Sequence, residues 1–169
     1  TIRLDLIDND TIVGETENPL GGEGENNGDY TDGEVYTIDR TPRVSAITRA
    51  NPNPTNASSV DFTITFSAYV SNVDLSDFVL TTTGVTGAEI TSIDKSWGWN
   101  ETFTLTVDTG YGNGTIRLDL VDDDSIVNFS SEPLGGEGEG NGNYVDGEIY
   151  TIEKGLAVSS LLRTGTSPT

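Results

Sequence analysis

The sequence predicts an all-β fold, in which short antiparallel strands form a two-sheet β-sandwich that belongs to a tandem repeat. Three observations lead to this prediction. Apolar and polar residues alternate with a period of two in several short segments, Gly, Asn, Asp and Ser separate these segments, and one long stretch occurs twice. No segment has the period expected of an amphipathic helix.

The clearest strand is "SVDFTITFSAYV", where Val60, Phe62, Ile64 and Phe66 alternate with polar residues. The predicted strands are 43–49, 59–70, 77–84, 88–96, 102–110, 115–122 and 148–154, and residues 72–78 are expected to add one helical turn. Seven short strands in about 110 residues, with turn residues every 8 to 12 positions, are typical of an immunoglobulin-like sandwich.

Strand alternation also predicts which side chains face the core. The predicted core includes Val60, Phe62, Ile64, Phe66, Leu80, Phe103, Leu105, Ile116, Leu118 and Leu120.

The repeat has an offset of 114 residues, because "TIRLDLIDNDTIVG" begins at Thr1 and "TIRLDLVDDDSIVN" begins at Thr115. The alignment continues without a gap to Arg40 and Lys154. We therefore expect residues 1–40 to be the C-terminal part of a preceding repeat, residues 41–154 a complete repeat, and residues 155–169 the start of the next. The apolar residues of the first part need partners that this sequence does not supply: Ile2, Leu4, Leu6 and Tyr36. We expect other copies of the repeat to supply them, either in the same continuous chain or in a neighbouring molecule.

Composition excludes several classes of function. The chain has no Cys, no Met and no His, so it has no disulfides, no thiolate site and no Ser-His or His-metal chemistry. A net charge of −20 disfavours nucleic acid and favours cations as partners. We expect no enzyme activity. The missing initiator Met, and the lack of an apolar run long enough for a membrane span, suggest an internal piece of a longer exported protein.

Four stretches of the repeat carry a resemblance to a known family: "RVSAITRANPNPTNASSVDFTITFS", "DFVLTTTGV", "GNGTIRLDLVDDDSIV" and "PLGGEGEGNGNYVDGEIYTI". In these stretches the repeat resembles the immunoglobulin-like domains that are tandemly arrayed in large bacterial extracellular surface proteins and adhesins. The resemblance implies an exported module of a stalk, filament or surface layer, often stiffened by calcium near domain junctions. Related repeats often carry an Asp-x-x-Gly-Asn-Pro turn, whereas this chain has "GETENP" and "FSSEP".

Acidic residues are concentrated in the repeated stretch: of 28 Asp and Glu, 11 lie in residues 1–40 and 10 in residues 115–154. The connection from about Asp123 to Gly147 is long for a sandwich, which favours a function or an ordering ligand. Calcium takes six to eight oxygen ligands, and glycine lets backbone carbonyls turn inward. The candidate ligands recur in both copies: Asp8, Asp10, Glu23, Glu25, Asn27, Asp32 and Glu34, then Asp122, Asp124, Glu137, Glu139, Asn141, Asp146 and Glu148.

The sequence also allows two alternative interpretations. The acidic loops could be solvated spacers without a ligand. In addition, "KSWGWNE" places Trp97 and Trp99 on one side of a strand, and with Tyr111 they could form a carbohydrate-binding face, or cover a sheet edge or a neighbouring module.

Overall fold

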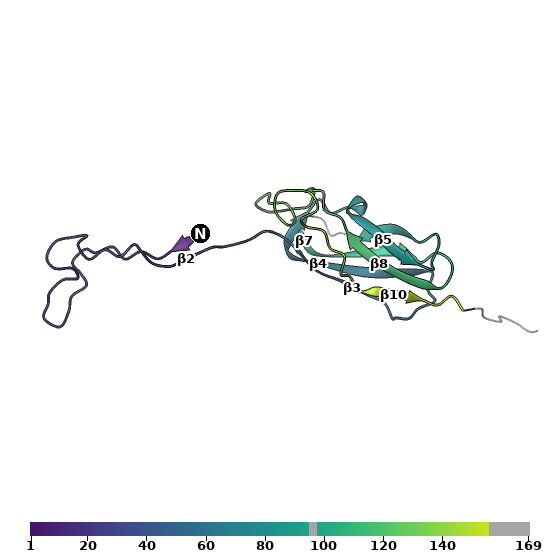
Figure 1. Cartoon of the computed structure of the whole chain (residues 1–169), viewed down its shortest axis with the longest axis horizontal. Helices are drawn as coiled ribbons and strands as arrows, with labels where there is room; N and C mark the ends of the chain where they lie inside the picture. The colour runs from purple at the N-terminus through teal and green to yellow at the C-terminus, as the bar shows by residue number, and fades with distance from the viewer. Residues whose placement is uncertain (95–97, 156–169) are drawn as a thin grey trace, which may run out of the picture. The chain divides into compact units, whose positions relative to one another are not determined.

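The structure is a computed structural model that describes residues 1–94 and 98–155. The chain divides into two compact units, Thr1–Arg40 and Thr41–Thr169. We call the first unit the hairpin and the described part of the second unit the module, and each is described by itself (Figure 1).

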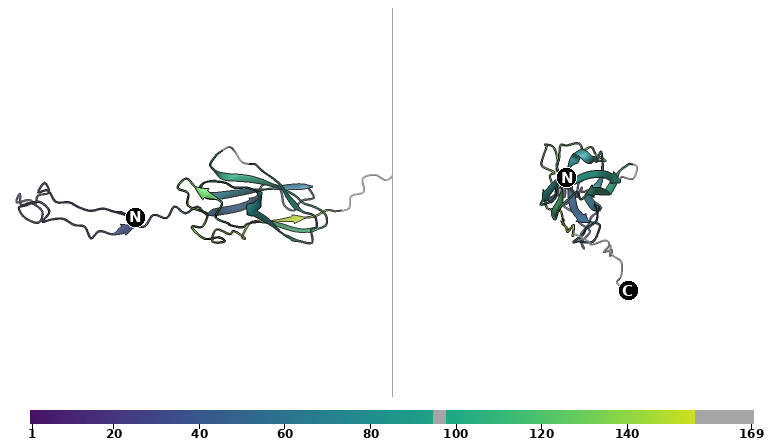
Figure 2. Two further views of the ribbon diagram at one scale, coloured as in Figure 1. Left: turned by 90° about the horizontal axis from the view of Figure 1, so that it is seen from above. Right: turned by 90° about the vertical axis from the view of Figure 1, so that its right-hand side faces the viewer.

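The module is all-β, and its strands form two antiparallel sheets that enclose one core (Figures 1 and 2). The first sheet has the order β3-β4-β7-β6, and the short strand β9 also pairs with β4. The second sheet has the order β10-β8-β5. The bounds are β3 Val44–Arg49, β4 Ser59–Ser71, β5 Phe78–Thr83, β6 Glu89–Asp94, β7 Asn100–Asp108, β8 Gly114–Leu120, β9 Val127–Asn128 and β10 Ile149–Ile152.

Each of the seven predicted strands overlaps a strand of the module. The long strand β4 lies in the centre of its sheet, and its four predicted core residues, Val60, Phe62, Ile64 and Phe66, are all buried. The predicted helical turn is the 3₁₀ helix η1, Leu75–Asp77, which Asp74 caps by accepting a hydrogen bond from the Ser76 backbone N–H. Strand β9 was not predicted, because two residues are too few to form an alternating pattern.

The core agrees with the prediction except at one residue. Nine of the ten predicted residues are buried, whereas Leu80 is only partly buried against the core. The reason is the position of β5, which is an edge strand of the three-stranded sheet and leaves one side open. The core also contains residues outside the predicted set: Ile47, Val70, Val73, Phe78, Val85, Val107, Ile126, Leu134, Tyr150 and Ile152.

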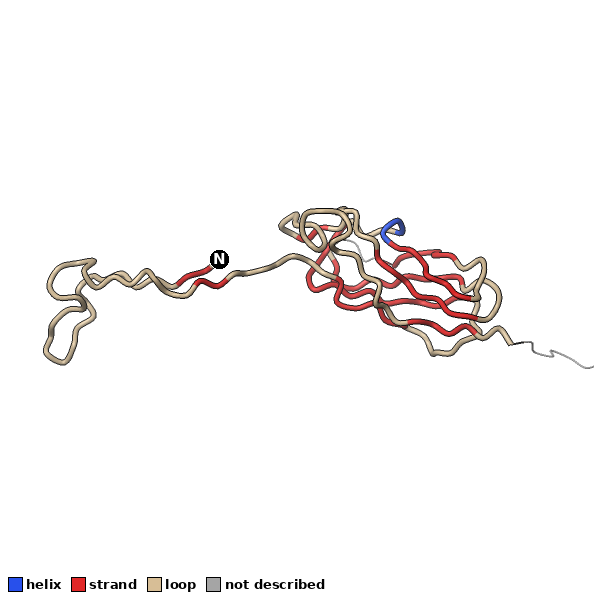
Figure 3. Tube along the Cα trace, viewed as in Figure 1, coloured by secondary structure: helices blue, strands red, loops and turns tan. Residues whose placement is uncertain are grey.

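The hairpin consists mostly of loop, with strand β1, Ile2–Arg3, paired to strand β2, Val35–Tyr36 (Figure 3). Leu6 and Tyr30 form a further antiparallel bridge. Most of its large apolar side chains are exposed, among them Leu4 with an exposed fraction of 88%. The hairpin therefore has local structure but no core of its own.

Candidate functional site: the acidic loop

The acidic loop of the module, residues 121–147, is organised around the buried carboxylate of Asp122. One carboxylate oxygen accepts the Asp124 N–H at 3.2 Å, and the other accepts the Gly142 N–H at 3.0 Å. The Asp122 N–H donates to Oδ1 of Asn143 at 2.7 Å. These bonds join the start of the loop to its end, so Asp122 holds the loop closed.

Asp124 makes the next contact across the loop. Its Oδ2 accepts the Gly138 N–H at 3.0 Å, while its Oδ1 is buried and has no hydrogen-bond partner within the described part of the chain. A buried carboxylate oxygen without a donor is costly, because it loses its hydration without compensation. Oδ1 of Asp124 is therefore the atom in this loop that is best placed to coordinate a cation or to accept a hydrogen bond from a water molecule.

The glycines of "GGEGEGNG" have a structural role in this arrangement. Gly135 has φ +76°, and a Cβ there would lie 2.3 Å from Oδ1 of Asn141. A Cβ on Gly142 would lie 2.7 Å from the Leu134 side chain. The side-chain amide of Asn141 donates to the carbonyls of Gly136 and Glu137 at 3.1 and 3.0 Å. Glycine is needed here because the loop folds back tightly on itself.

The hairpin contains the same network in its own acidic loop, residues 7–33. Asp8 is buried and accepts the N–H groups of Asp10 and Gly28, both at 3.1 Å. Asp10 accepts the Gly24 N–H at 3.0 Å, and its Oδ1 is again buried without a hydrogen-bond partner among the described residues. Asn27 donates to backbone carbonyls as Asn141 does. The same residue types thus give the same contacts in both loops.

The remaining candidate ligands do not converge. Glu148 accepts the Arg49 N–H at 2.7 Å and forms an ion pair with the Arg49 guanidinium at 3.5 Å, which fixes it on β3. Within residues 1–94 and 98–155, no group of three or more acidic side chains is arranged to hold a metal ion. The exposed candidates are Glu23, Glu25, Asn27, Asp32 and Glu34 in the hairpin, and Glu137, Glu139, Asn141, Asp146 and Glu148 in the module.

The acidic loop is anchored at the end of the module where the chain enters. Leu134 is fully buried in the core, and the Gly135 N–H donates to the carbonyl of buried Pro42 at 2.9 Å. On the other side, the Ser125 hydroxyl donates to the buried carboxylate of Asp77 at 3.1 Å. Burial raises the pKa of Asp77 above its ordinary value, against the lowering effect of its hydrogen bonds.

The predicted aromatic face is not formed by the residues that the structure describes. Trp99 precedes β7 and Tyr111 follows it, so the strand separates them by roughly 26 Å, and Trp97 lies outside the described residues. Trp99 instead stacks on Phe129, with ring centroids 4.4 Å apart, and Tyr69 lies 6.1 Å from Phe129. Phe129, which belongs to the acidic loop, is 66% exposed and Tyr69 is 49% exposed, so the three rings form a small aromatic patch that is partly open to solvent.

Sequence reasoning missed several residues of the network. Asn143 and its equivalent Asp29 were not candidates because their residue types differ, although each accepts the N–H of the central Asp at 2.7 Å. Comparing oxygen acceptors instead of identical residues would have found this pair. Asp77 had no counterpart in the repeated stretch, and only its burial reveals it.

Comparison with protein-family models, with curated proteins and with solved structures gives no match to this chain. The described residues also contain no helix that is long and apolar enough to cross a membrane.

Proposed function

We propose that this chain is part of a non-catalytic structural repeat of an extracellular stalk, filament or surface layer, built from immunoglobulin-like sandwiches that follow one another with a period of 114 residues. The observation that carries the proposal is the duplicated acidic loop: Asp8 and Asp122 hold two loops of identical layout, 114 residues apart. The same local structure thus recurs at the period of the sequence repeat.

The position of the loop supports a role at the joint between repeats. A hydrogen bond from the Gly135 N–H joins it to Pro42, where the chain enters the module. Strand β10 ends at the opposite end of the module, where Ile152 pairs with Thr55. In an array of such modules, each acidic loop would lie where the preceding repeat ends. The strong negative charge suits an exposed, soluble and mutually repelling array.

Calcium at the acidic loop is the second part of the proposal. Oδ1 of Asp124 is one buried anionic oxygen. The exposed carboxylates of Glu137 and Glu139 lie on either side of Gly138 in the sequence, and the Gly138 N–H donates to Oδ2 of Asp124. Both carboxylate oxygens of Asp122 accept backbone N–H groups and so stabilise the loop. We therefore do not include Asp122 among the proposed calcium ligands. Because the acidic side chains that the structure describes form no preformed cage, the proposed affinity is weak, with Kd of roughly 10⁻⁴ to 10⁻³ M, as in many extracellular modules.

Thermal melting of the 169-residue chain tests this proposal. Calcium at ten times Kd should add about 1.4 kcal/mol per site to the free energy of unfolding. We expect a higher melting temperature in calcium than in sodium at matched ionic strength, because screening alone does not reproduce coordination. Asp124→Asn should lose most of the calcium effect, and without calcium it should be no less stable than the wild type, since it removes an unpartnered anionic oxygen.

Asp123→Asn is the matched control, because it removes the same charge from the neighbouring residue, which lacks an equivalent Asp in the hairpin. It should keep the calcium effect. Equal melting temperatures in calcium and in chelator at matched ionic strength would leave the acidic loops as solvated spacers. Equal losses in the two variants would assign the effect to net charge.

A second candidate function is carbohydrate binding, now at the aromatic patch of Tyr69, Trp99 and Phe129 instead of the predicted face. Exposed aromatic rings can stack on the apolar faces of sugars. Titration with glycans, monitored by Trp fluorescence, tests it. A change that saturates in the wild type and disappears in Phe129→Ala supports binding there, and an unchanged signal supports packing alone.

A further inference from the structure

The hairpin has the same strand pairing as residues 115–154 of the module. Equivalent residues pair in the two segments: Ile2 with Tyr36 and Leu6 with Tyr30 in the hairpin, and Ile116 with Tyr150 and Leu120 with Tyr144 in the module. The hairpin therefore repeats the strand pairing of the segment that completes the module.

One edge of the hairpin is open. In the module, β8 lies between β10 and β5, and six residue pairs join it to β5. In the hairpin, β1 pairs only with β2 among the described residues. The backbone groups of β1 on the side away from β2 can therefore accept another strand, as open edges do.

The same residues that complete the core of the module are exposed in the hairpin. Leu4 is 88% exposed and Tyr36 is 71% exposed, whereas their equivalents Leu118 and Tyr150 are fully buried. Covering these side chains is favourable, because burial of apolar surface is the main driving force of folding and association. The module shows which surface covers them: the inner faces of the strands in residues 41–114.

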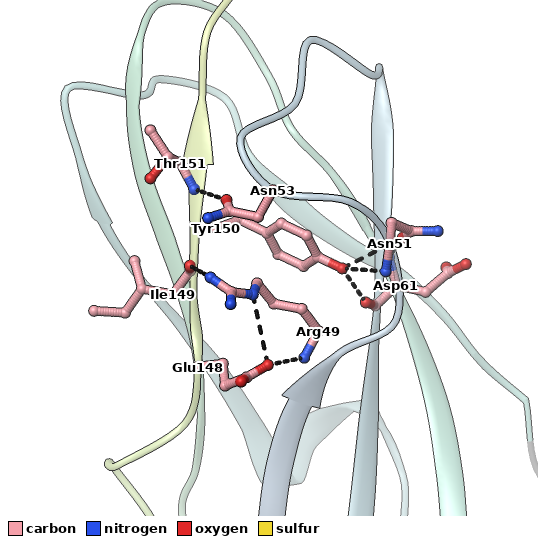
Figure 4. Close-up of polar contacts among 8 residues, drawn as sticks. All are labelled: Arg49, Asn51, Asn53, Asp61, Glu148, Ile149, Tyr150 and Thr151. Carbon is pink, nitrogen blue, oxygen red and sulfur yellow. Dashed lines mark hydrogen bonds and ion pairs between the residues drawn. The ribbon is translucent and has the colours of Figure 1, made fainter.

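Tyr150 shows how this surface recognises the segment through polar contacts. Its hydroxyl accepts the Asn51 N–H at 2.8 Å and donates to the carbonyl of Asp61 at 2.8 Å (Figure 4). These contacts join β10, which carries Tyr150, to Asp61 on β4 and to Asn51 in the segment that follows β3. Tyr36 carries the same hydroxyl at the same position of the hairpin.

Two carboxylates make further contacts of this kind. Glu148 accepts the Arg49 N–H at 2.7 Å, and Asp119 accepts the Thr81 hydroxyl at 2.6 Å. The equivalents in the hairpin are Glu34 and Asp5. Asp5 is already held by Arg3 at 2.6 Å, as Asp119 is held by Arg117. The hairpin thus keeps both the apolar and the polar groups that fit residues 41–114.

We infer that the hairpin is a strand donor whose receptor is the surface formed by residues 41–114 of a second copy of this chain. In the exchanged complex β1 pairs with β5, and the hairpin replaces the receptor's own residues 115–154. The inference rests on the proposed repeat architecture. The tethered segment 115–154 has a high effective concentration, so exchange requires that this segment be weakened or that the protein be concentrated.

A matched pair of leucines tests the inference in the 169-residue chain. Leu118→Asp weakens the tethered segment and leaves the donor intact. We expect residues 115–154 to lose protection from hydrogen exchange, residues 1–40 to become protected by about tenfold or more, and the mass to increase with protein concentration. The double variant with Leu4→Asp should lose both the protection and the multimers. Unprotected residues 1–40 in Leu118→Asp, or equal multimers in the double variant, would overturn the inference.

A disulfide trap gives a second readout, which remains informative if Leu118→Asp fails to fold. The chain has no cysteine, and Thr83 pairs with Thr115, the equivalent of Thr1. The pair Thr1→Cys and Thr83→Cys should crosslink two chains, both in the Leu118→Asp background and in otherwise unchanged protein at high concentration. The control pair Thr1→Cys and Thr82→Cys should not, because residue 82 faces the other side of β5.

Equal crosslinking by the two pairs, or none in either background, would show that exchange does not occur. That result would leave the calcium experiment unaffected, because calcium binding at the acidic loop does not need a second chain. Failure of strand exchange and failure of the proposed function are therefore distinguishable.

Discussion

Carboxylates in the acidic loop have different roles, and the number of donors that reach each oxygen decides the role. Both oxygens of Asp122 accept backbone N–H groups, so this side chain acts as a structural clamp. Asp124 has one oxygen in such a bond and one without a donor. Glu137 and Glu139 are exposed. Residues of one chemical class thus divide into a clamp, a candidate ligand and solvated charges.

Asp77 predicts how stability depends on pH. Burial raises its pKa, so the folded module binds a proton more tightly there than the unfolded chain does. Its contribution to the free energy of unfolding is therefore fully present below its unfolded pKa and is lost as pH rises through its folded pKa. Denaturant unfolding of wild type and Asp77→Asn between pH 3 and 7 measures this, and the variant should show a weaker gain on acidification.

The pKa of Asp123 is shifted in the opposite direction, because hydrogen bonds from Ser125 lower it. The stability that Asp123 contributes is therefore lost as pH falls through its folded pKa. Asp123→Asn serves as a control, because it should change the pH dependence of the free energy of unfolding in the direction opposite to Asp77→Asn. Identical pH profiles for wild type and Asp77→Asn would show that Asp77 does not govern this part of the pH dependence.

At the scale of elements, alternation along a strand predicted most of the module. Residues of β4 were placed on the correct faces because, at its central position in the sheet, the large apolar side chains of one face are buried. Leu80 was predicted to be buried but is only partly buried, because a sequence does not show which strand lies at a sheet edge. The contacts of the acidic loop were not predictable for a related reason: Asp122 meets Gly142 only after the loop has closed.

Phe66 on β4 gives a direct test of this register. It is 3% exposed and packs edge-on against Phe103, with ring centroids 5.7 Å apart. Phe66→Ala should lower the free energy of unfolding by about 3 to 5 kcal/mol. Tyr69→Ala on the same strand is the control, because Tyr69 is 49% exposed and its loss should cost much less. Equal costs in chemical denaturation would contradict the assigned faces.

At the scale of the whole molecule, the chain combines two units that differ in how much of their apolar surface is covered. Local sequence determines the fold of the acidic loops, because the network around Asp8 forms in the hairpin as it does around Asp122 in the module. Stability requires more than this local structure. Leu134 is fully buried in the module, whereas the equivalent Leu20 is 36% exposed in the hairpin.

This difference predicts unequal proteolysis at two identical local sequences. Both units contain "PLGGEGE", so a Glu-specific protease meets Glu23 and Glu25 in the same context as Glu137 and Glu139. Cleavage requires local unfolding, which in the module must also withdraw Leu134 from the core. In dilute protein we expect cleavage after Glu23 or Glu25 to be faster by about tenfold or more, as measured by mass spectrometry over time. In Leu134→Ala the two rates should approach each other, because the anchor is lost. Equal rates in the wild type would mean that the core does not stabilise the acidic loop of the module.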